Sequence, residues 1–532
     1  MRKIKIGFLL LFIPFFVSAQ EQFSISIASS SITSVPAWHS GAFAEWSGKW
    51  IFIGGRIDGL HNFQAGQAFD VFSRNDSVFV VDPVADQRWS ASLSVLPHSM
   101  YEAICSANME YFQDDSMLYM IGGYGRNDSS FTKITFPTLT AIHIDGLVNA
   151  VMTASPVNSF FRQVMDTNLA IAGGRLEKID STYYLVFGHR FDGLYDKNSG
   201  STLFVQHYSN EIRKFNIHDD GVALSITNFQ TIVDTTHFHR RDYNLVPQVF
   251  PGGEFGMTAF GGVFQKFANL PFLNPIDITS SSTVVNNSFD QNLSQYETAC
   301  MPVHDSTNNF MHTFFFGGMS LYTYDTTTQS LVQDTLIPFV KTISKISRDG
   351  SGNLTEYSLP IQMPSLLGTN ARFIPDRNLS LDHNAIIRLN SLPANSHAGW
   401  IVGGIQSDFP NIAHLDPGSM SRASSEVFDV FIHKSIVHVQ DQLIKNEINN
   451  FFVYPNPSDW IFHIEFSTNE KLKLEVAVYH ANGKKIVSLF DGWHQPGDSK
   501  LSWDASHVKA GIYFCRVKSG SYSKSVKLVI EK

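Results

Sequence analysis

A short apolar strand that stops at two glycines recurs along the chain and constrains its fold more than any other feature. KWIFIGG is the first copy, and SMLYMIGG, YYLVFGH, FGMTAFGG, HTFFFGG and GWIVGG follow. The copies are anchored on Gly54, Gly122, Gly188, Gly261, Gly317 and Gly403, at spacings of 68, 66, 73, 56 and 86 residues. A strand repeated at such a period indicates one supersecondary unit used several times.

The first copy lies in a segment that predicts four antiparallel strands. HSGAFAEW and KWIFIGG are joined by a Ser-Gly turn, a polar loop runs to about Asp76, and SVFVVD and RWSASLSVL follow. Four antiparallel strands closed by turns are typical of one blade of a β-propeller. Glycine suits the place where blades taper together, because it permits close approach and unusual φ values. An aromatic content of 13% agrees with an all-β fold.

The last repeat offers strands two and three but no strand four, and the N-terminal segment supplies one. QFSISIASSSITSVPAWHSG aligns with strand four of the first repeat and the residues after it. We therefore expect six blades, with 23–30 pairing beside 427–433. Closing the ring in this way removes both free sheet edges.

These repeats resemble the kelch-repeat family of β-propellers, through the Gly-Gly strand and the Trp-bearing fourth strand at Trp89. The Tyr expected before Trp89 is missing, and blade three has Gly188-His189 in place of Gly-Gly. The resemblance implies a six-bladed kelch-like propeller over residues 20–434.

The first nineteen residues predict a secretory signal peptide. Three basic residues, an apolar run from Ile6 to Val17 and a small-residue boundary indicate cleavage between Ala19 and Gln20. The apolar run is too short to span a bilayer, and no later stretch is long and apolar enough. Loss of the three basic residues changes the formal net charge from −9 to −12. An acidic chain without basic clusters argues against nucleic acid as a partner.

A polar linker over 435–450 precedes a second predicted domain, 451–532, with the alternating strands of an antiparallel β-sandwich. This domain resembles the type A C-terminal sorting domain of the type IX secretion system. The residues that carry the resemblance are Tyr454, Pro455, Asn456, Pro457, Gly483, Gly511, Tyr513 and Lys527. It implies a Bacteroidetes-type bacterium, the secretion machinery as a partner, and passage to the cell surface or beyond, with removal of the module.

Candidate binding residues gather where strand one begins and strand two ends, because these points share one face of a propeller. In the strand-one positions we place His39, Glu102, Tyr243, Glu297 and His383, and in the long loops after strand two Arg56, His61, Arg126, His189 and Arg190. Long loops rarely persist without use, which favours a ligand-binding rim. The alternative is structural: Asp and Asn cap turns, and each Arg pairs with a nearby Asp.

The functional prediction is a secreted or cell-surface binding module for a glycan or a protein. A carbohydrate-active enzyme of the sialic-acid mutarotase kind, a kelch epimerase, is the alternative. It requires an acid/base pair drawn from Glu102, Glu297, His39 and His383. The sequence has no nucleophile elbow, HExxH motif or phosphate loop, and we expect no cofactor. His237 and His239 could share a strand face, but we expect loop histidines rather than a metal site.

Overall fold

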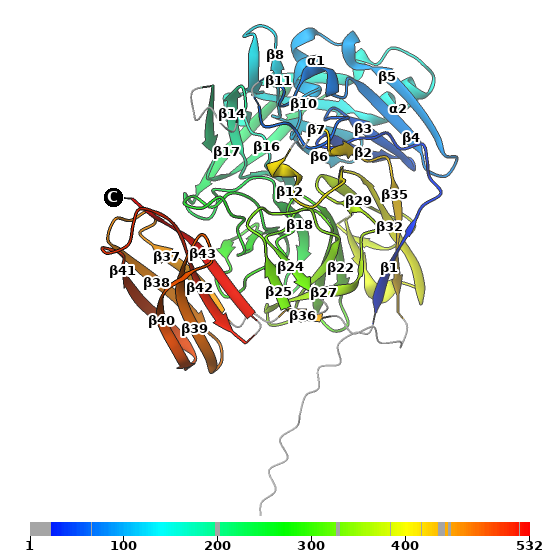
Figure 1. Ribbon diagram of the computed structural model, residues 1–532. Coiled ribbons are helices and arrows are strands. Elements are labelled where there is room, and N and C mark those ends of the chain that lie inside the picture. Colours follow the sequence, from blue (N-terminus) through cyan, green and yellow to red (C-terminus); the bar gives the residue numbers. More distant parts are fainter. Residues whose placement is uncertain are drawn as a thin grey trace, which may run out of the picture.

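The computed structural model describes residues 23–531, apart from 65, 197–202, 326–329, 384, 416–417, 435–441, 445–447 and 521. The predicted signal peptide and its cleavage residues Ala19 and Gln20 lie outside the described residues. Antiparallel sheets account for most of the chain, arranged around a central axis with a separate sandwich at one side (Figure 1). The all-β prediction is confirmed.

Three four-stranded antiparallel sheets make up the first half of the ring. Sheet one has β2 (Ala42–Trp46), β3 (Lys49–Ile53), β4 (Ser77–Asp82) and β5 (Gln87–Ser92). Sheet two has β6 (Glu110–Asp114), β7 (Met117–Ile121), β10 (Thr138–His143) and β11 (Phe161–Met165). Sheet three has β12 (Arg175–Ile179), β13 (Thr182–Val186), β16 (Glu211–Asp219) and β17 (Leu224–Val233).

The second half repeats the plan, with extra strands on sheet five. Sheet four has β18 (Asn244–Val249), β19 (Phe255–Phe260), β20 (Ile276–Thr279) and β21 (Thr283–Val285). Sheet five has β22 (Ala299–Asp305), β23 (Phe310–Phe316), β26 (Thr342–Arg348) and β27 (Leu354–Gln362), extended by β30 (Leu381–Asp382), β31 (Ile386–Arg388) and β36 (Gln442–Ile444). Sheet six has β29 (Ala371–Pro375), β32 (Asn395–Gly403), β35 (Val427–His433) and β1 (Ser24–Ser29).

The N-terminal strand closes the ring. β1 pairs with β35 in antiparallel register from Ser24 opposite His433 to Ser29 opposite Phe428. The expected position of the N-terminal segment beside 427–433 is therefore confirmed.

A layer of buried apolar side chains lies between each pair of neighbouring sheets, which is why the second strands are apolar on both faces. Leu118 joins the layer of Ile51, and Leu176 joins that of Ile121. The series ends with Val402 of sheet six packed in one cluster with Phe52 of sheet one. The apolar cores therefore run around the axis without a gap.

The repeated glycines bring the end of each strand two against the next blade. The amide of Gly55 donates to the Ser106 carbonyl at 2.9 Å, and the amide of Gly404 donates to the Trp38 carbonyl at 2.9 Å. At Gly122, φ is 69° and a Cβ atom would lie 1.9 Å from the Ile171 carbonyl oxygen. Both close approach and positive φ therefore require glycine there.

Blade three departs from the expected pattern in an informative way. The amide that donates to the next blade is that of Gly188, bonded to the Arg240 carbonyl at 3.0 Å. Gly188 is thus the second member of the pair, and Phe187 holds the first position with φ of 49°. The assignment of Gly188-His189 as the pair is wrong by one residue. The pair is Phe187-Gly188, and a phenylalanine in the first position does not match the glycine of the other blades.

Several of the long loops after strand two carry short hairpins. These are β8 (Tyr124–Asn127) with β9 (Thr132–Thr135), β14 (His189–Gly193) with β15 (Phe204–Tyr208), and β24 (Tyr322–Asp325) with β25 (Ser330–Gln333). In blade six, β28 (Leu366–Leu367), β33 (Ile405–Ser407) and β34 (Ser421–Ala423) form a small sheet.

The C-terminal domain is a two-layer sandwich of seven strands, as predicted. One layer has β37 (Ile448–Tyr454), β38 (Ile461–Thr468) and β41 (Gly497–Asp504). The other has β39 (Leu472–His480), β40 (Lys485–His494), β42 (Gly511–Ser519) and β43 (Tyr522–Ile530). Within the expected linker, β36 pairs with β27, and β37 begins at Ile448.

Residues of the expected sorting motif hold the first loop of the sandwich to its last strand. The Asn456 side chain accepts a hydrogen bond from the Val529 amide at 2.9 Å and donates to the Lys527 carbonyl at 2.6 Å. Pro455 and Pro457 flank Asn456. The buried Tyr513 donates its hydroxyl to the Lys509 carbonyl at 2.9 Å.

Gly483 and Gly511 have positive φ values of 85° and 151°. The Tyr454 hydroxyl accepts from the Lys500 ammonium group at 2.6 Å. Gly483 thus permits the turn before β40, Gly511 begins β42, and the Lys500–Tyr454 bond lies at one edge of the domain.

The sandwich packs against blades four and five of the ring, beside the strands drawn in green (Figure 1). Leu293 and Tyr322 of the propeller are buried in one apolar cluster with sandwich residues that include Leu528. Lys524 forms an ion pair with Asp290. The two domains therefore share a contact surface in addition to the linker.

Candidate functional site

Six residues leading into the innermost strands share a left-handed backbone conformation, which only small polar residues and glycine adopt at low cost. They are Ser40, Asn108, Gly173, Asp242, Glu297 and Asn370, with φ of 55°, 56°, 68°, 52°, 48° and 60°. We call these six residues the collar. In five blades, the residue before the collar position forms a β-bridge to the segment just after strand two, as His39 does with Arg56.

Main-chain hydrogen bonds link consecutive collar residues around the axis. The Asn108 amide donates to the Ser40 carbonyl at 2.8 Å, and the Gly173 amide donates to the Asn108 carbonyl at 3.0 Å. The Asp242 amide donates to the Gly173 carbonyl at 2.8 Å, and the Asn370 amide to the Glu297 carbonyl at 2.5 Å. These bonds join the collar residues in two runs, one from Ser40 to Asp242 and one from Glu297 to Asn370.

Several buried oxygen atoms at the collar receive no hydrogen bond from the described part of the protein. They are the Oδ1 atoms of Asn108, Asp242 and Asn370, and Oε2 of Glu110 just after the collar in β6. Asp242 and Asn370 are each 8% exposed as whole residues, and Glu110 is 1% exposed. An unpaired buried acceptor costs about 1–3 kcal/mol, so a hydrogen-bond donor from outside the fold would stabilise these atoms.

Two arginines, Arg175 and Arg372, lie two positions after a collar residue at the start of an innermost strand. Arg175 of β12 forms an ion pair with Glu297 at 3.2 Å. The Arg372 guanidinium of β29 lies 5.2 Å from the Tyr111 ring centre, and its Nε atom has no partner among the described residues. These arginines therefore add hydrogen-bond donors to the acceptors of the collar.

Two carboxyl groups of the innermost strands hold protons near neutral pH. Burial raises the pKa of Glu110 to about 8, although its Oε1 accepts the Gly174 amide at 2.6 Å. Burial also raises the pKa of Glu177 to about 7, against the lowering effect of Arg175 and Arg372. Groups with such pKa values are suited to donate or accept protons.

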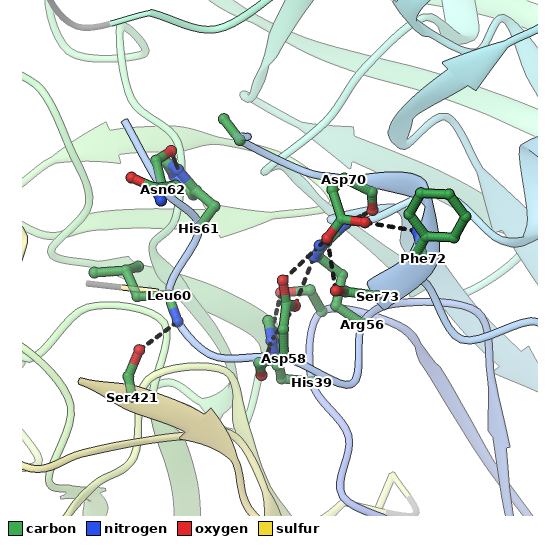
Figure 2. A network of polar contacts seen from close by, with 12 residues as sticks. His39, Arg56, Asp58, Leu60, His61, Asn62, Asp70, Phe72, Ser73 and Ser421 are labelled. Carbon is green, nitrogen blue, oxygen red and sulfur yellow. Dashed lines mark hydrogen bonds and ion pairs between the residues drawn. The ribbon is translucent and has the colours of Figure 1, made fainter. Parts of the chain in front are cut away.

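The first rim loop forms a dense polar network at its base (Figure 2). Arg56, 4% exposed, donates to both carboxylate oxygens of Asp58, at 2.8 and 2.5 Å, and to the Asp70 carbonyl at 3.1 Å. His39 places its Nε2 3.0 Å from the Asp58 carbonyl oxygen. These contacts use the hydrogen-bonding groups of Arg56 within the loop.

The same Arg-x-Asp pairing occurs in two more blades. Arg126 donates to Asp128 at 3.0 Å, and Arg190 donates to Asp192 at 2.6 Å. The structural alternative, in which each arginine pairs with a nearby aspartate, thus describes all three arginines. Arg190 differs from Arg56 because 54% of its side chain remains exposed.

Two rim histidines lie among aromatic rings. His61 stacks on Phe69 with ring centres 4.4 Å apart and meets Tyr195 edge-on at 5.1 Å. His189 of β14 lies 2.6 Å from the Gln206 amide through its Nδ1. Burial lowers the pKa of His61 to about 4 and lowers that of His189 well below its usual value. Both imidazoles are therefore neutral at physiological pH.

Arg241 is the rim residue that the sequence analysis missed. It forms an ion pair with Asp242, lies over the Phe264 ring at 5.6 Å, and has an Nε atom without a partner among the described residues. Its positive charge also lowers the pKa of His61 and His189. Its only signal in the sequence is its place directly before Asp242.

Three of the expected strand-one positions are wrong or have another role. Glu102 lies in helix α1 (His98–Ile104), and its position in the repeat belongs to Asn108. His383 is exposed and stacks on Phe255 at 3.8 Å, and Asn370 takes its position. Tyr243 is fully buried and donates to the Val186 carbonyl at 2.6 Å.

The cause is inserted structure: Glu102 lies in a segment between β5 and β6, and His383 lies between β29 and β32 of blade six. Helix α1 precedes β6, and a 3-10 turn, Thr167–Leu169, precedes β12. Asp166 accepts a hydrogen bond from the Asn168 amide at 2.8 Å and so caps this turn. His237 and His239 contact different partners, Asp234 and Asn210.

Comparisons with known proteins identify the C-terminal domain. Residues 452–531 match the family of the secretion system C-terminal sorting domain. The chain therefore carries a sorting domain of the type IX secretion system, which directs it to the cell surface or the exterior. No helix in the described part of the chain has both the length and the apolar character to cross a membrane. Among curated proteins, none matches.

Solved structures with similarity to this chain include YjhT, with a TM-score of 0.41 and 11% identity over 75% of this chain and 98% of that one. A fungal alcohol oxidase of the AA5 family, in complex with copper, has a TM-score of 0.37 and 9% identity over 96% and 100% of the two chains. PorZ of Porphyromonas gingivalis, a surface component of its type-IX secretion system, has a TM-score of 0.24 and 10% identity over 92% and 59%.

Proposed function

We propose that the mature propeller is a ligand-binding module that works outside the cell and takes its ligand at the collar. The observation that carries this proposal is the set of buried acceptor oxygens on Asn108, Asp242 and Asn370 that the described residues leave unpaired. Buried polar atoms are nearly always hydrogen-bonded, so acceptors gathered on one ring favour a partner from outside the fold.

A glycan suits these atoms better than an apolar ligand. Sugar hydroxyl groups can donate to the collar oxygens and accept from the guanidinium groups of Arg241 and Arg372. Aromatic rings at the rim, such as Phe69 and Tyr195 beside His61, add apolar faces of the kind found in binding sites. A protein loop that inserts polar side chains is the other ligand class.

Two observations bear on the mutarotase-like alternative, the first against it and the second in its favour. No hydrogen bond or ion pair joins any two of the four described residues His39, Glu102, Glu297 and His383, so the expected acid/base pair is absent from that set. Glu110 and Glu177 of the innermost strands instead hold protons near neutral pH. Two such carboxyl groups would be the candidates for proton transfer in an enzyme.

The test uses the mature chain, residues 20–532, on glycan and peptide arrays, followed by titration of any ligand found. In the double variant N108G/N370G, glycine keeps the left-handed backbone while both acceptor oxygens are removed. We expect this variant to lose at least tenfold in affinity. The matched control is Asn309→Gly, because Asn309 also has a positive φ of 55° but lies in the turn between β22 and β23.

Unchanged affinity in N108G/N370G would contradict binding at the collar. The enzyme alternative is tested separately by following anomer interconversion of reducing sugars by NMR. If the propeller is catalytic, Glu110→Gln should slow that exchange. If the protein only binds, the exchange should proceed at its spontaneous rate with wild type and with the variant.

A further inference from the structure

Three potential metal ligands meet at the rim of blade two, apart from the collar. His98 and Glu102 lie one turn apart on α1, and Asp128 lies just after β8. The His98 Nε2 atom is 3.4 Å from Glu102 Oε1 and 3.0 Å from Asp128 Oδ2. One ligand atom from each of the three residues lies within 4.8 Å of the others.

These separations match the edges of a tetrahedral zinc site. Zinc binds imidazole nitrogen at about 2.0–2.1 Å and carboxylate oxygen at about 2.0–2.2 Å, so two ligands of a tetrahedron lie about 3.4 Å apart. A metal would thus need only small adjustments of side chains whose backbone is already in place. The imidazole ligand also argues against calcium and magnesium, which prefer sites built from oxygen alone.

The burial of Glu102 gives an independent argument. Its side chain is 2% exposed, and the Asp128 amide donates to Oε1 at 2.7 Å. A buried carboxylate requires charge compensation, and the basic group in contact with Glu102 is the imidazole of the exposed His98. Two carboxylates and one Zn²⁺ ion form a neutral set, which removes this cost.

A second layer of contacts already orients the third ligand. Arg126 donates from Nε to Asp128 Oδ1 at 3.0 Å, which leaves Oδ2 directed at His98. Carboxylate ligands of metals are commonly held by such outer hydrogen bonds. Arg126, expected from the sequence to contact a ligand directly, acts in this arrangement through Asp128.

We propose that His98, Glu102 and Asp128 form a zinc site with three protein ligands and one open position. The side chains of His98 and Asp128 are 63% and 51% exposed, so the open position faces solvent. It takes a water molecule or an anionic group of a bound partner, since the Arg126 guanidinium adds positive charge beside a neutral metal set.

The experiment titrates EDTA-treated mature protein with Zn²⁺ by calorimetry and with Co²⁺ by visible absorption. We expect one saturable Zn²⁺ site, and intense Co²⁺ bands of a tetrahedral complex. Both His98→Ala and Glu102→Gln should weaken binding at least tenfold. Because His98 is exposed, its alanine variant is expected to fold as the wild type does, which circular dichroism checks.

The matched control is His218→Ala. His218 is an exposed histidine 4.0 Å from Asp220, and it belongs to none of the possible metal-ligand groups found among the described residues. Wild-type affinity in this control together with loss in His98→Ala supports the site. The proposal is overturned by absence of a saturable site, by equal Zn²⁺ affinity of His98→Ala and wild type, or by tighter binding of Ca²⁺ than Zn²⁺.

Discussion

Replacing Glu110 by glutamine should stabilise the propeller relative to wild type, and this gain should be larger at neutral pH than at acidic pH. The carboxyl group of Glu110 has a pKa of about 8 in the fold, against an ordinary value of 4.5. Between these values, the folded chain keeps a proton that the unfolded chain releases. Stability therefore falls as pH rises through this window.

The size of the effect follows from the pKa difference. Each pH unit inside the window costs about 1.4 kcal/mol, so the step from pH 5 to pH 7.5 costs about 3 kcal/mol from this one group. The glutamine amide is neutral in both states, and its oxygen can still accept the Gly174 amide. Other buried carboxyl groups, such as Glu177 and Glu356, act equally in both proteins.

The assay is urea unfolding of both mature proteins at pH 5 and pH 7.5, followed by tryptophan fluorescence. The difference in unfolding free energy should move by about 3 kcal/mol in favour of Glu110→Gln at the higher pH. Glu426→Gln, at an exposed carboxylate of blade six, controls for the loss of one charge. Parallel pH profiles for wild type and Glu110→Gln would refute the burial argument.

Three further outcomes are expected. Arg56→Ala should lower the unfolding free energy by about 3 kcal/mol because it leaves buried partners unpaired, whereas Arg190→Ala should change it by under about 1 kcal/mol; equal effects in urea unfolding would contradict this. Gly122→Ala should cost more than about 2 kcal/mol, and Gly221→Ala, which meets no atom within 4 Å, about 1 kcal/mol, by the same assay. Removal of 451–532 should leave a folded propeller in the periplasm that binds more of an apolar dye, since the domain covers an apolar face; fractionation that finds it outside the cell would count against the sorting assignment.

The repeat in the sequence predicted the fold because its signal is physical and local. Positive φ at the end of an apolar strand selects glycine, so the repeated glycines can be read from the sequence. Alternating polar and apolar residues predict the strands of the sandwich. The N-terminal strand was found for the same reason, since QFSISIAS has the pattern of the strand it replaces.

The collar could be predicted only in part. Its six members share a backbone conformation rather than a residue type. An alignment by residue type therefore places Glu102 and His383 where the structure has Asn108 and Asn370. Small polar residues directly before an apolar strand, such as Asn108 and Asn370, carry the weak signal that remains. Phe187, which replaces the first glycine of the pair in blade three, has a positive φ that its residue type does not predict.

The contact between the sorting domain and the ring was also missed, for a different reason. A polar linker predicted two independent domains, whereas Leu293 and Tyr322 are buried in one cluster with sandwich residues. Tertiary packing between distant segments has no period in the sequence, so only the structure reveals it.

The pairing of β1 with β35 sets the order in which the ring can be completed. Ser26 and His433, hydrogen-bonded at 2.8 Å, are 407 positions apart. The entropic cost of closing so long a loop grows only slowly with its length, by about 0.6 kcal/mol for each doubling, so one strand pairing offsets it. β1 precedes β35 along the chain and nevertheless has no partner strand until the last blade exists. A chain that emerges from one end therefore remains an open stack of sheets until β35 arrives, and its final shape is acquired in a single late step.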